Sequence, residues 1–488
     1  MHMQLSARAL LLSVFLLSSL AVADEPVGSA LRVSENGRYL VDAHGEPFFW
    51  LGDTAWLITQ KTTRDDVELY LKTRAEQGFT VIQPAFVMGE ERVGGTLVPN
   101  SYGDRAFVGG NPAQPLVTPG NDVQNAAQYD YWDNVDYIVE RAAAHGLTLA
   151  ALPLFIGAGG DGYKYLTVGR AYDYGVFLGT RYRDNRNLIW VLGGDHIAQS
   201  GTEDYRPVWN ELARGIAVGV SGSEDYSQTL MTFHPRGGYS SSAWFHTAPW
   251  LDFNMVEVWG DEKDIYPKLS QDYQRTPRKP TVLGEGSYEN GPQYPTKPIN
   301  ARNIRKQAYW SYFAGGNYTY GNTDTWNFGT VPSENVQDWK EALHAPGAED
   351  LAVLARLIES LDWWKFVPDE SLFASGKGSG DMLNVAMRTE SGDQILAYLS
   401  SPASFALRLD GMTSAKAQAT WFDPRTGEQV ELGEVATGQV RWFSPPTGWE
   451  DAVLHLTPVP EPSTLCLLGA GLLGFVAYRR GRRSWRRG

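Results

Sequence analysis

The chain has 488 residues, enough for two or three domains, or for one large barrel with a smaller partner. Hydrophobic residues make up 43% and charged residues 20%, which is typical of a globular chain and excludes a disordered one. The formal net charge of −14 argues against nucleic-acid binding, because no basic field would attract phosphates. The single cysteine, Cys466, excludes a disulfide framework and a thiolate zinc site.

Residues 1–23 have the three parts of a secretory signal peptide. Arg8 supplies the positive start, an apolar stretch runs from Ala9 to Leu17, and Ala21-Val22-Ala23 is a small-residue cleavage site. A buried first helix is the alternative interpretation. The pattern favours the signal, so we expect the protein to be exported.

Residues 459–488 form a three-part tail. A Pro-Glu-Pro segment ending at Pro462 precedes an apolar run from Thr464 to Tyr478, and six arginines follow. The run is short for a permanent span, and the arginines would stay on the cytoplasmic side. The tail resembles the PEP-CTERM sorting signal of exported Gram-negative proteins. This resemblance implies transient inner-membrane contact, removal by an exosortase-type protease, and delivery to the cell envelope, surface or extracellular matrix. A retained transmembrane tail anchor is the alternative.

The middle of the chain alternates short apolar runs with helical patterns. We predict strands over residues 48–53, 80–86, 147–155, 187–192, 229–234, 253–259, 280–285 and 317–320. We predict helices over residues 64–77, 131–145, 171–183, 206–217, 301–314 and 349–364. Apolar strands with helical crossovers indicate a parallel sheet covered on both faces. Eight such units fit a (β/α)8 TIM barrel, spanning residues 24–365, better than a doubly wound sheet.

The pattern changes over residues 366–458 to short alternating strands separated by turn signals. The clearest strands are 384–388, 394–399 and 417–422, and residues 423–428 have the composition of a tight turn. This segment predicts a small all-β sandwich domain.

Two acids are predicted to lie at the carboxyl ends of barrel strands, where barrel enzymes have their catalytic residues. Asp195 follows the fourth predicted strand and Glu285 ends the seventh. Glycines beside both acids would let a ligand approach the backbone closely. An acid/base and a nucleophile about 5–5.5 Å apart are the pair that a retaining glycosidase needs. A hydrogen-bonding role at the barrel rim is the structural alternative.

Three segments that include these acids resemble one enzyme family. They are Phe49–Trp56, Trp190–Asp195 and Gly284-Glu285. Over residues 31–361 the chain resembles the apiosidase-like catalytic domain of glycoside hydrolase family 140, and the following β-domain is similar to one described as collagen-binding. The resemblance implies that Asp195 is the acid/base and Glu285 the nucleophile. The family's characterised activity removes apiose side chains from a pectic polysaccharide, and fold and chemistry transfer better than the sugar.

Other polar and aromatic residues near predicted strand ends are candidates for substrate binding. They are Asp53, Trp56, Gln83, His234, Trp259, Tyr288 and Tyr320, with Trp326 as a further rim residue. Glu257 either points inward or is a buried structural acid. His196, His234 and His246 are too scattered to predict a metal site, and we expect no cofactor.

We therefore predict an exported, retaining, exo-acting glycoside hydrolase that acts on a polysaccharide or oligosaccharide. A surface or matrix adhesin that binds glycan without cleaving it is the alternative. The pair of Asp195 and Glu285 favours the enzyme, because a binding-only barrel has no reason to keep both acids.

Overall fold

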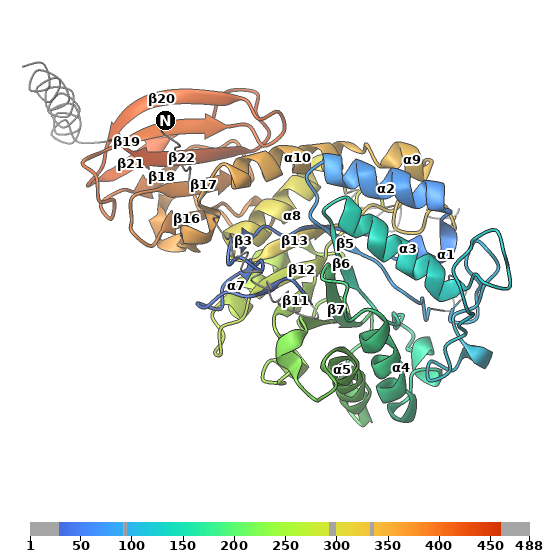
Figure 1. The fold of residues 1–488 in the computed structure, drawn as a ribbon. Helices are drawn as coiled ribbons and strands as arrows, with labels where there is room; N and C mark the ends of the chain where they lie inside the picture. The colour runs from blue at the N-terminus through green and yellow to red at the C-terminus, as the bar shows by residue number, and fades with distance from the viewer. Residues whose placement is uncertain (1–28, 91–92, 94, 292–298, 332–335, 460–488) are drawn as a thin grey trace, which may run out of the picture.

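The computed structural model describes residues 29–90, 93, 95–291, 299–331 and 336–459. Its larger domain is built on eight parallel strands in the order β10-β7-β6-β5-β4-β13-β12-β11. The outer strands of this order, β10 and β11, also contact each other, so the sheet curls into a nearly closed barrel (Figure 1). The predicted TIM barrel is thereby confirmed. Its strands are β4 (Leu51–Thr54), β5 (Val81–Gln83), β6 (Thr148–Ala151), β7 (Leu188–Gly193), β10 (Met231–His234), β11 (Asn254–Glu257), β12 (Thr281–Glu285) and β13 (Asn317–Tyr320).

Helices follow the strands and cover the outside of the barrel (Figure 1). They are α1 (Ile58–Lys61), α2 (Arg64–Glu76), α3 (Tyr131–Ala144), α4 (Val168–Arg181), α5 (Arg206–Ser221), α6 (Ser242–Phe245), α7 (Ile265–Tyr273), α8 (Ala301–Phe313), α9 (Trp339–Ala342) and α10 (Pro346–Glu359). Short 3-10 turns lie at Val108–Gly110, Asp161–Lys164, Tyr226–Gln228, Glu262–Asp264, Trp363–Lys365, Glu370–Leu372 and Gly380–Met382.

Four helices, α2, α3, α5 and α8, begin at the residue that the sequence predicts, and all of these except α5 have a reciprocal capping box. Thr63, Asp130 and Asn300 each accept a backbone N–H from three residues ahead, and that third residue's side chain bonds back. Helix α7 was not predicted. It has only nine residues and carries Pro267, which is tolerated in a first turn but weakens a helical pattern.

Two small sheets are formed by segments that adjoin barrel strands in the sequence, and these sheets were also not predicted. One is formed by β1 (Arg32–Val33), β2 (Leu40–Val41) and β3 (Pro47–Phe48), and the other by β8 (Gln199–Ser200) and β9 (Glu203–Asp204). Strands of two residues are too short to show the alternation on which strand prediction depends.

Helices α4 and α5 touch along a line of glycines. A Cβ atom on Gly179 would lie 2.3 Å from the carbonyl oxygen of Ile216, and one on Gly215 would lie 2.2 Å from that of Tyr172. The two helices can approach this closely only because neither position carries a side chain.

The smaller domain, called the β-domain below, consists of two antiparallel sheets that share one core, as predicted for a sandwich. One sheet has the order β14-β16-β17-β22-β19-β20 and the other β15-β18-β21. The strands are β14 (Phe366–Pro368), β15 (Phe373–Ser375), β16 (Val385–Thr389), β17 (Ile395–Leu399), β18 (Phe405–Arg408), β19 (Lys416–Phe422), β20 (Gln429–Ala436), β21 (Val440–Phe443) and β22 (Ala452–Pro458).

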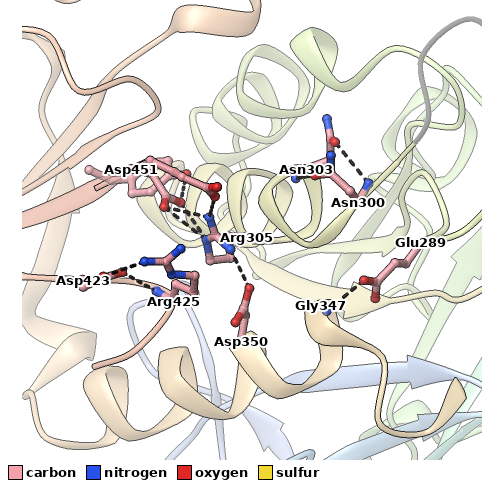
Figure 2. A network of polar contacts seen from close by, with 11 residues as sticks. Glu289, Asn300, Asn303, Arg305, Gly347, Asp350, Asp423, Arg425 and Asp451 are labelled. Atoms are coloured by element: carbon pink, nitrogen blue, oxygen red, sulfur yellow. Dashed lines mark hydrogen bonds and ion pairs between the residues drawn. The ribbon is translucent and has the colours of Figure 1, made fainter. Parts of the chain in front are cut away.

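The β-domain packs on helices α8 and α10, on the outside of the barrel (Figure 1). Figure 2 shows Arg305 of α8 at the centre of this interface, between Asp451 of the β-domain and Asp350 of α10. Its guanidinium lies 2.9 Å from the Asp451 carboxylate and 2.5 Å from that of Asp350. Nearby, the rings of Tyr309 and Tyr398 stack with their centroids 4.4 Å apart. The interface therefore combines apolar packing with a buried cation that both domains share.

The predicted signal peptide and nearly all of the predicted sorting tail lie outside the described residues. Within the described part of the chain, no helix is long and apolar enough to cross a membrane.

We predict that Arg305→Met lowers the free energy of unfolding by about 3–5 kcal/mol, because Asp451 and Asp350 would keep buried charges without their partner. Urea denaturation measures the change. Arg206→Met is the matched control, since its pair with Asp204 is exposed and an exposed ion pair contributes little to stability. Equal losses in the two variants would contradict a stabilising role for the buried ion pair.

Candidate active site

Four ionisable side chains meet at the carboxyl ends of neighbouring barrel strands. His234, Glu257 and Glu285 are the last residues of β10, β11 and β12, and Asp195 lies two residues beyond β7. Each contributes an atom to a cluster whose members all lie within 4.8 Å of one another. The structure thus brings Asp195 and Glu285 together, as the sequence predicts, and adds a third acid between β10 and β12.

A shift in strand register places two of these acids side by side. Strands β11 and β12 pair from Asn254 to Val256 in one register, which then shifts so that Glu257 lies opposite Glu285 instead of Gly284. Irregularities of this kind re-aim a side chain at the rim of a barrel. Neighbouring residues of parallel strands point to the same face, so both carboxyls face the barrel interior.

Asp195 is placed by two glycines that no other residue can replace without strain. Gly193 and Gly194 have φ angles of 109° and 136°, in a region that L-residues rarely adopt. A Cβ atom on Gly194 would also lie 2.4 Å from the carbonyl oxygen of Ile156. The chain therefore turns sharply after β7, and Asp195 is left half-buried at the edge of the cluster.

His234 lies beside both glutamates. Its Nδ1 is 3.0 Å from the carbonyl oxygen of Pro235, which can only accept, so we assign the proton on Nδ1. Its Nε2 lies 3.2 Å from Glu285 Oε2, although the two atoms are not aligned as a hydrogen bond. The His234 ring therefore borders the Glu285 carboxylate on one side without a hydrogen bond to it.

Two aromatic residues border Glu285 and His234. The Trp56 indole N–H donates to the Tyr288 hydroxyl at 2.7 Å, and the Trp56 ring meets the His234 ring edge-on. Burial, followed by the negative charge of Glu285, raises the pKa of Tyr288 well above its usual range. Its hydroxyl therefore stays protonated and faces the carboxylate as a potential donor.

An open cavity of about 680 Å³ lies over the cluster. Its walls are formed by Ala158, Asp195, Arg236, Gly237, Glu257 and Trp259. The Trp259 side chain is 49% exposed, which leaves an aromatic face available for stacking on a sugar ring. A more enclosed, apolar cavity between Tyr39, Trp363 and Phe366 lies where the β-domain meets the barrel, away from the four ionisable groups. We therefore place the chemistry in the open cavity.

The charge of Glu257 is strongly disfavoured in this environment. Burial is the largest cause, and the charges of Asp195 and Glu285 add to it, so that the pKa of Glu257 is raised well above its ordinary value. The guanidinium of Arg236 opposes this shift with a smaller effect. Acids at one site that differ in their readiness to ionise are suited to acid/base catalysis.

Three of the predicted substrate-binding residues make their contacts inside the protein. Asp53 is fully buried and lies 2.6 Å from the Arg74 guanidinium. Gln83 donates to the Gly284 carbonyl at 3.1 Å, and the Tyr320 hydroxyl donates to Glu289 at 2.6 Å. Trp56, His234, Tyr288 and Trp259 instead lie around the acids or the cavity.

The expectation that glycines beside Glu285 leave room for a ligand is not met. A Cβ atom on Gly284 would collide with Met255 at 2.5 Å, and one on Gly286 would lie 2.2 Å from Gln307 Oε1. These glycines are required by packing of the barrel itself.

Sequence reasoning left Glu257 undecided and did not select Arg236. Glu257 ends a strand, as Glu285 does and Asp195 nearly does, so its position was a usable signal. The register shift that aims it inward leaves no mark in the sequence. Because the histidines are scattered along the sequence, their spacing did not indicate that His234 would lie beside three acids. The spacing of the four groups would accommodate a divalent cation, but spacing alone does not identify them as metal ligands.

Comparisons with known proteins agree with this geometry. The family model of an apiosidase-like catalytic domain matches residues 34–365, that of a collagen-binding domain of a collagenase matches residues 367–457, and a PEP-CTERM sorting motif matches residues 458–483. All three resemblances predicted from the sequence are confirmed.

Solved structures with the same fold are glycoside hydrolases by name. One named glycoside hydrolase is 29% identical, with a TM-score of 0.77 over 89% of this chain and 98% of its own. A glycoside hydrolase family 5 protein from Bacteroides vulgatus is 30% identical, with a TM-score of 0.77 over 88% of this chain and 94% of its own. An uncharacterized Pseudomonas aeruginosa protein is 27% identical over 41% of this chain, which spans about half (52%) of that relative's length.

We predict that Gly194→Ala lowers both stability and activity. The strained φ angle alone costs about 1–3 kcal/mol, and a displaced Asp195 would lower kcat/KM on the order of 10²-fold. Thermal unfolding and turnover of an aryl glycoside substrate measure the two effects. Gly169→Ala is the control, because a Cβ atom at this position in α4 meets nothing within 4 Å. Wild-type values for Gly194→Ala would show that the turn does not position Asp195.

Proposed function

Because this chain belongs to the apiosidase-like catalytic domain family, we propose that it is an exported, retaining glycoside hydrolase that acts on polysaccharide side chains. Asp195 is the acid/base and Glu285 is the nucleophile. The observation that carries the proposal is their separation, since carboxyl oxygens of the two lie within 4.8 Å of each other. Retaining enzymes hold these groups about 5–5.5 Å apart, whereas inverting enzymes need about 6.5–9.5 Å to admit a water molecule.

The surroundings of each acid support its role. Glu285 lies between His234 and Tyr288, and the Tyr288 hydroxyl can donate toward its carboxylate and hold it in place for attack on the anomeric carbon. Asp195 borders the open cavity, where a leaving group can depart into solvent. Asp195 would protonate the leaving oxygen in the first step and activate water in the second.

The open cavity and the side chains around it support exo-action on a short branch of a polysaccharide. Trp259 provides an exposed aromatic surface in the cavity wall, and the buried Trp56 supports His234 and Tyr288 beside the acids. We propose Asp53, Gln83 and Tyr320 as residues that act on the substrate only through the groups they support, because their side chains bond to the protein interior.

Export and surface delivery follow from the sorting motif. We propose that an exosortase-type protease processes the tail at the inner membrane of a Gram-negative cell, and that the enzyme then reaches the envelope or extracellular matrix. The β-domain is proposed to brace the barrel, because it packs on α8 and α10 and supplies no residue to the walls of the active-site cavity.

The double displacement predicts opposite stereochemistry for two azide rescues. In Glu285→Gly, azide should attack from the vacated face and give a glycosyl azide of inverted configuration. In Asp195→Ala, azide should attack the glycosyl-enzyme and give a product of retained configuration. Without azide, Asp195→Ala should lose roughly 10²–10⁴-fold in rate on poor leaving groups and less on acidic phenols. A panel of p-nitrophenyl glycosides and pectic fractions identifies the substrate, and NMR of the first product gives its configuration.

An inverted first product from the wild-type enzyme would make Glu285 a general base and contradict the proposal. Glycan binding without any turnover across the panel would instead favour the adhesin.

We predict that a chain ending at Val459 folds and retains full activity but loses surface delivery. Val459 is kept because its N–H donates to the Lys416 carbonyl and completes the pairing of β22 with β19. Cell fractionation and immunoblotting follow the location, and circular dichroism follows the fold. Normal surface delivery of the shortened chain would exclude the tail as the sorting signal.

A further inference from the structure

The two-carboxyl mechanism leaves a third acid of the cluster without a role. Glu257 is 4% exposed, lies opposite Glu285 across the register shift, and forms part of the cavity wall beside Asp195. A purely structural acid would have its oxygens bonded to the protein. Glu257 Oε2 is instead buried without a hydrogen-bond partner among the described residues, at 3.9 Å from His234 Nδ1.

The charges around Glu257 explain which form it can take. Asp195 approaches from β7, Glu285 from β12, and His234 with Arg236 from β10 and the loop after it. Arg236 is exposed, and the two nitrogens of His234 face Pro235 and Glu285. These basic groups do not offset the negative charges of two buried glutamates and the half-buried Asp195, so one carboxyl must keep its proton.

The proposed function requires particular protonation states of the other two acids, Glu285 and Asp195. Glu285 must be ionised to attack, and Asp195 must alternate between its protonated and ionised forms. A permanent charge on Glu257 would oppose the ionisation of both neighbours. A neutral Glu257 would leave the site with a single negative charge on Glu285 in the resting enzyme.

We propose that Glu257 is a neutral carboxylic acid that donates a hydrogen bond from Oε2 to a sugar hydroxyl beside the bond that is cleaved. This role rests on the proposed glycosidase function for its ligand. The Gly237 backbone N–H bonds the Glu257 carboxyl, which leaves Oε2 to face the cluster. Among the described residues, no acceptor lies within hydrogen-bonding distance of Oε2, so a proton on this oxygen would be donated to the substrate. The residue thus binds substrate and keeps the electrostatic field of the site constant while Asp195 changes charge.

Infrared difference spectroscopy of the protein without substrate tests the charge state independently of any activity. At pH 7, wild type minus Glu257→Gln should show the carbonyl band of a protonated acid, and labelling glutamate with ¹³C should shift that band. Asp195→Asn should retain the shifted band. Glu289→Gln should retain it too, which separates Glu257 from the other buried glutamate with a raised pKa. Loss of a carboxylate band in Glu257→Gln would overturn the proposal.

Kinetic measurements then distinguish whether Glu257 acts as a hydrogen-bond donor or as a charged group. On whichever p-nitrophenyl glycoside the wild type hydrolyses, Glu257→Gln should retain activity within about tenfold, because the amide has the same shape and still donates. Glu257→Ala should lose clearly more, mainly in KM, whereas Glu285→Gln should lose turnover. Equal losses for Glu257→Gln and Glu257→Ala would show that the charge is required and overturn the proposal. Tight binding of Zn²⁺ by EDTA-treated wild type but not by Glu257→Gln would overturn it as well.

If no glycoside in the panel is hydrolysed, the proposed function fails while the infrared result still stands. If turnover is normal but Glu257 is ionised, only the present inference fails. Thermal unfolding of each variant shows that the fold is intact, and the isotope shift in the unsubstituted protein shows that a protonated glutamate is present before any substitution is made.

Discussion

The crowding of three carboxyl groups at one end of the barrel is the constraint on which the active site depends. Asp195 lies just beyond β7, and Glu257 and Glu285 end β11 and β12. Burial of Glu257 and repulsion from its two neighbours make it harder to ionise. The positions of the acids therefore make them unequal in their readiness to ionise. A double displacement needs acids that differ in this way.

The rest of the molecule keeps this arrangement rigid. The turn at Gly193 and Gly194 fits only because backbone atoms of Ile156 and His234 fill the space that side chains would take. Trp56 and Tyr288 form a bonded pair that fixes the wall next to Glu285. On the outer side, Arg305 ties α8 to the β-domain through buried ion pairs, and α8 leads directly into β13 (Figure 2). A bracing domain far from the chemistry can thereby support strand ends that must hold charged groups at short distances.

The sequence predicts those features that arise from one segment at a time. The capping boxes at Thr63, Asp130 and Asn300 mark helix starts because all the atoms involved lie within four residues. Asp195 and Glu285 stand out because apolar strands lead into them. The inward orientation of Glu257 depends on pairing between β11 and β12, and the packing of Met255 against Gly284 depends on the same contact. Such information belongs to two strands at once, so no single segment carries it.

The same distinction explains why family resemblance and geometry contribute different parts of the function. The resemblance supplies a reaction type and two roles, which rest on short motifs around Asp195 and Glu285. Geometry shows that His234 and Tyr288 lie beside Glu285, and that the cavity wall also contains Arg236, Glu257 and Trp259. Under the proposed function, the acids act on the glycosidic bond that all candidate substrates share, so interactions at this wall would distinguish one sugar from another. Specificity should therefore be sought in the loop after β10 and at the ends of β11, where the chain departs from regular strand geometry.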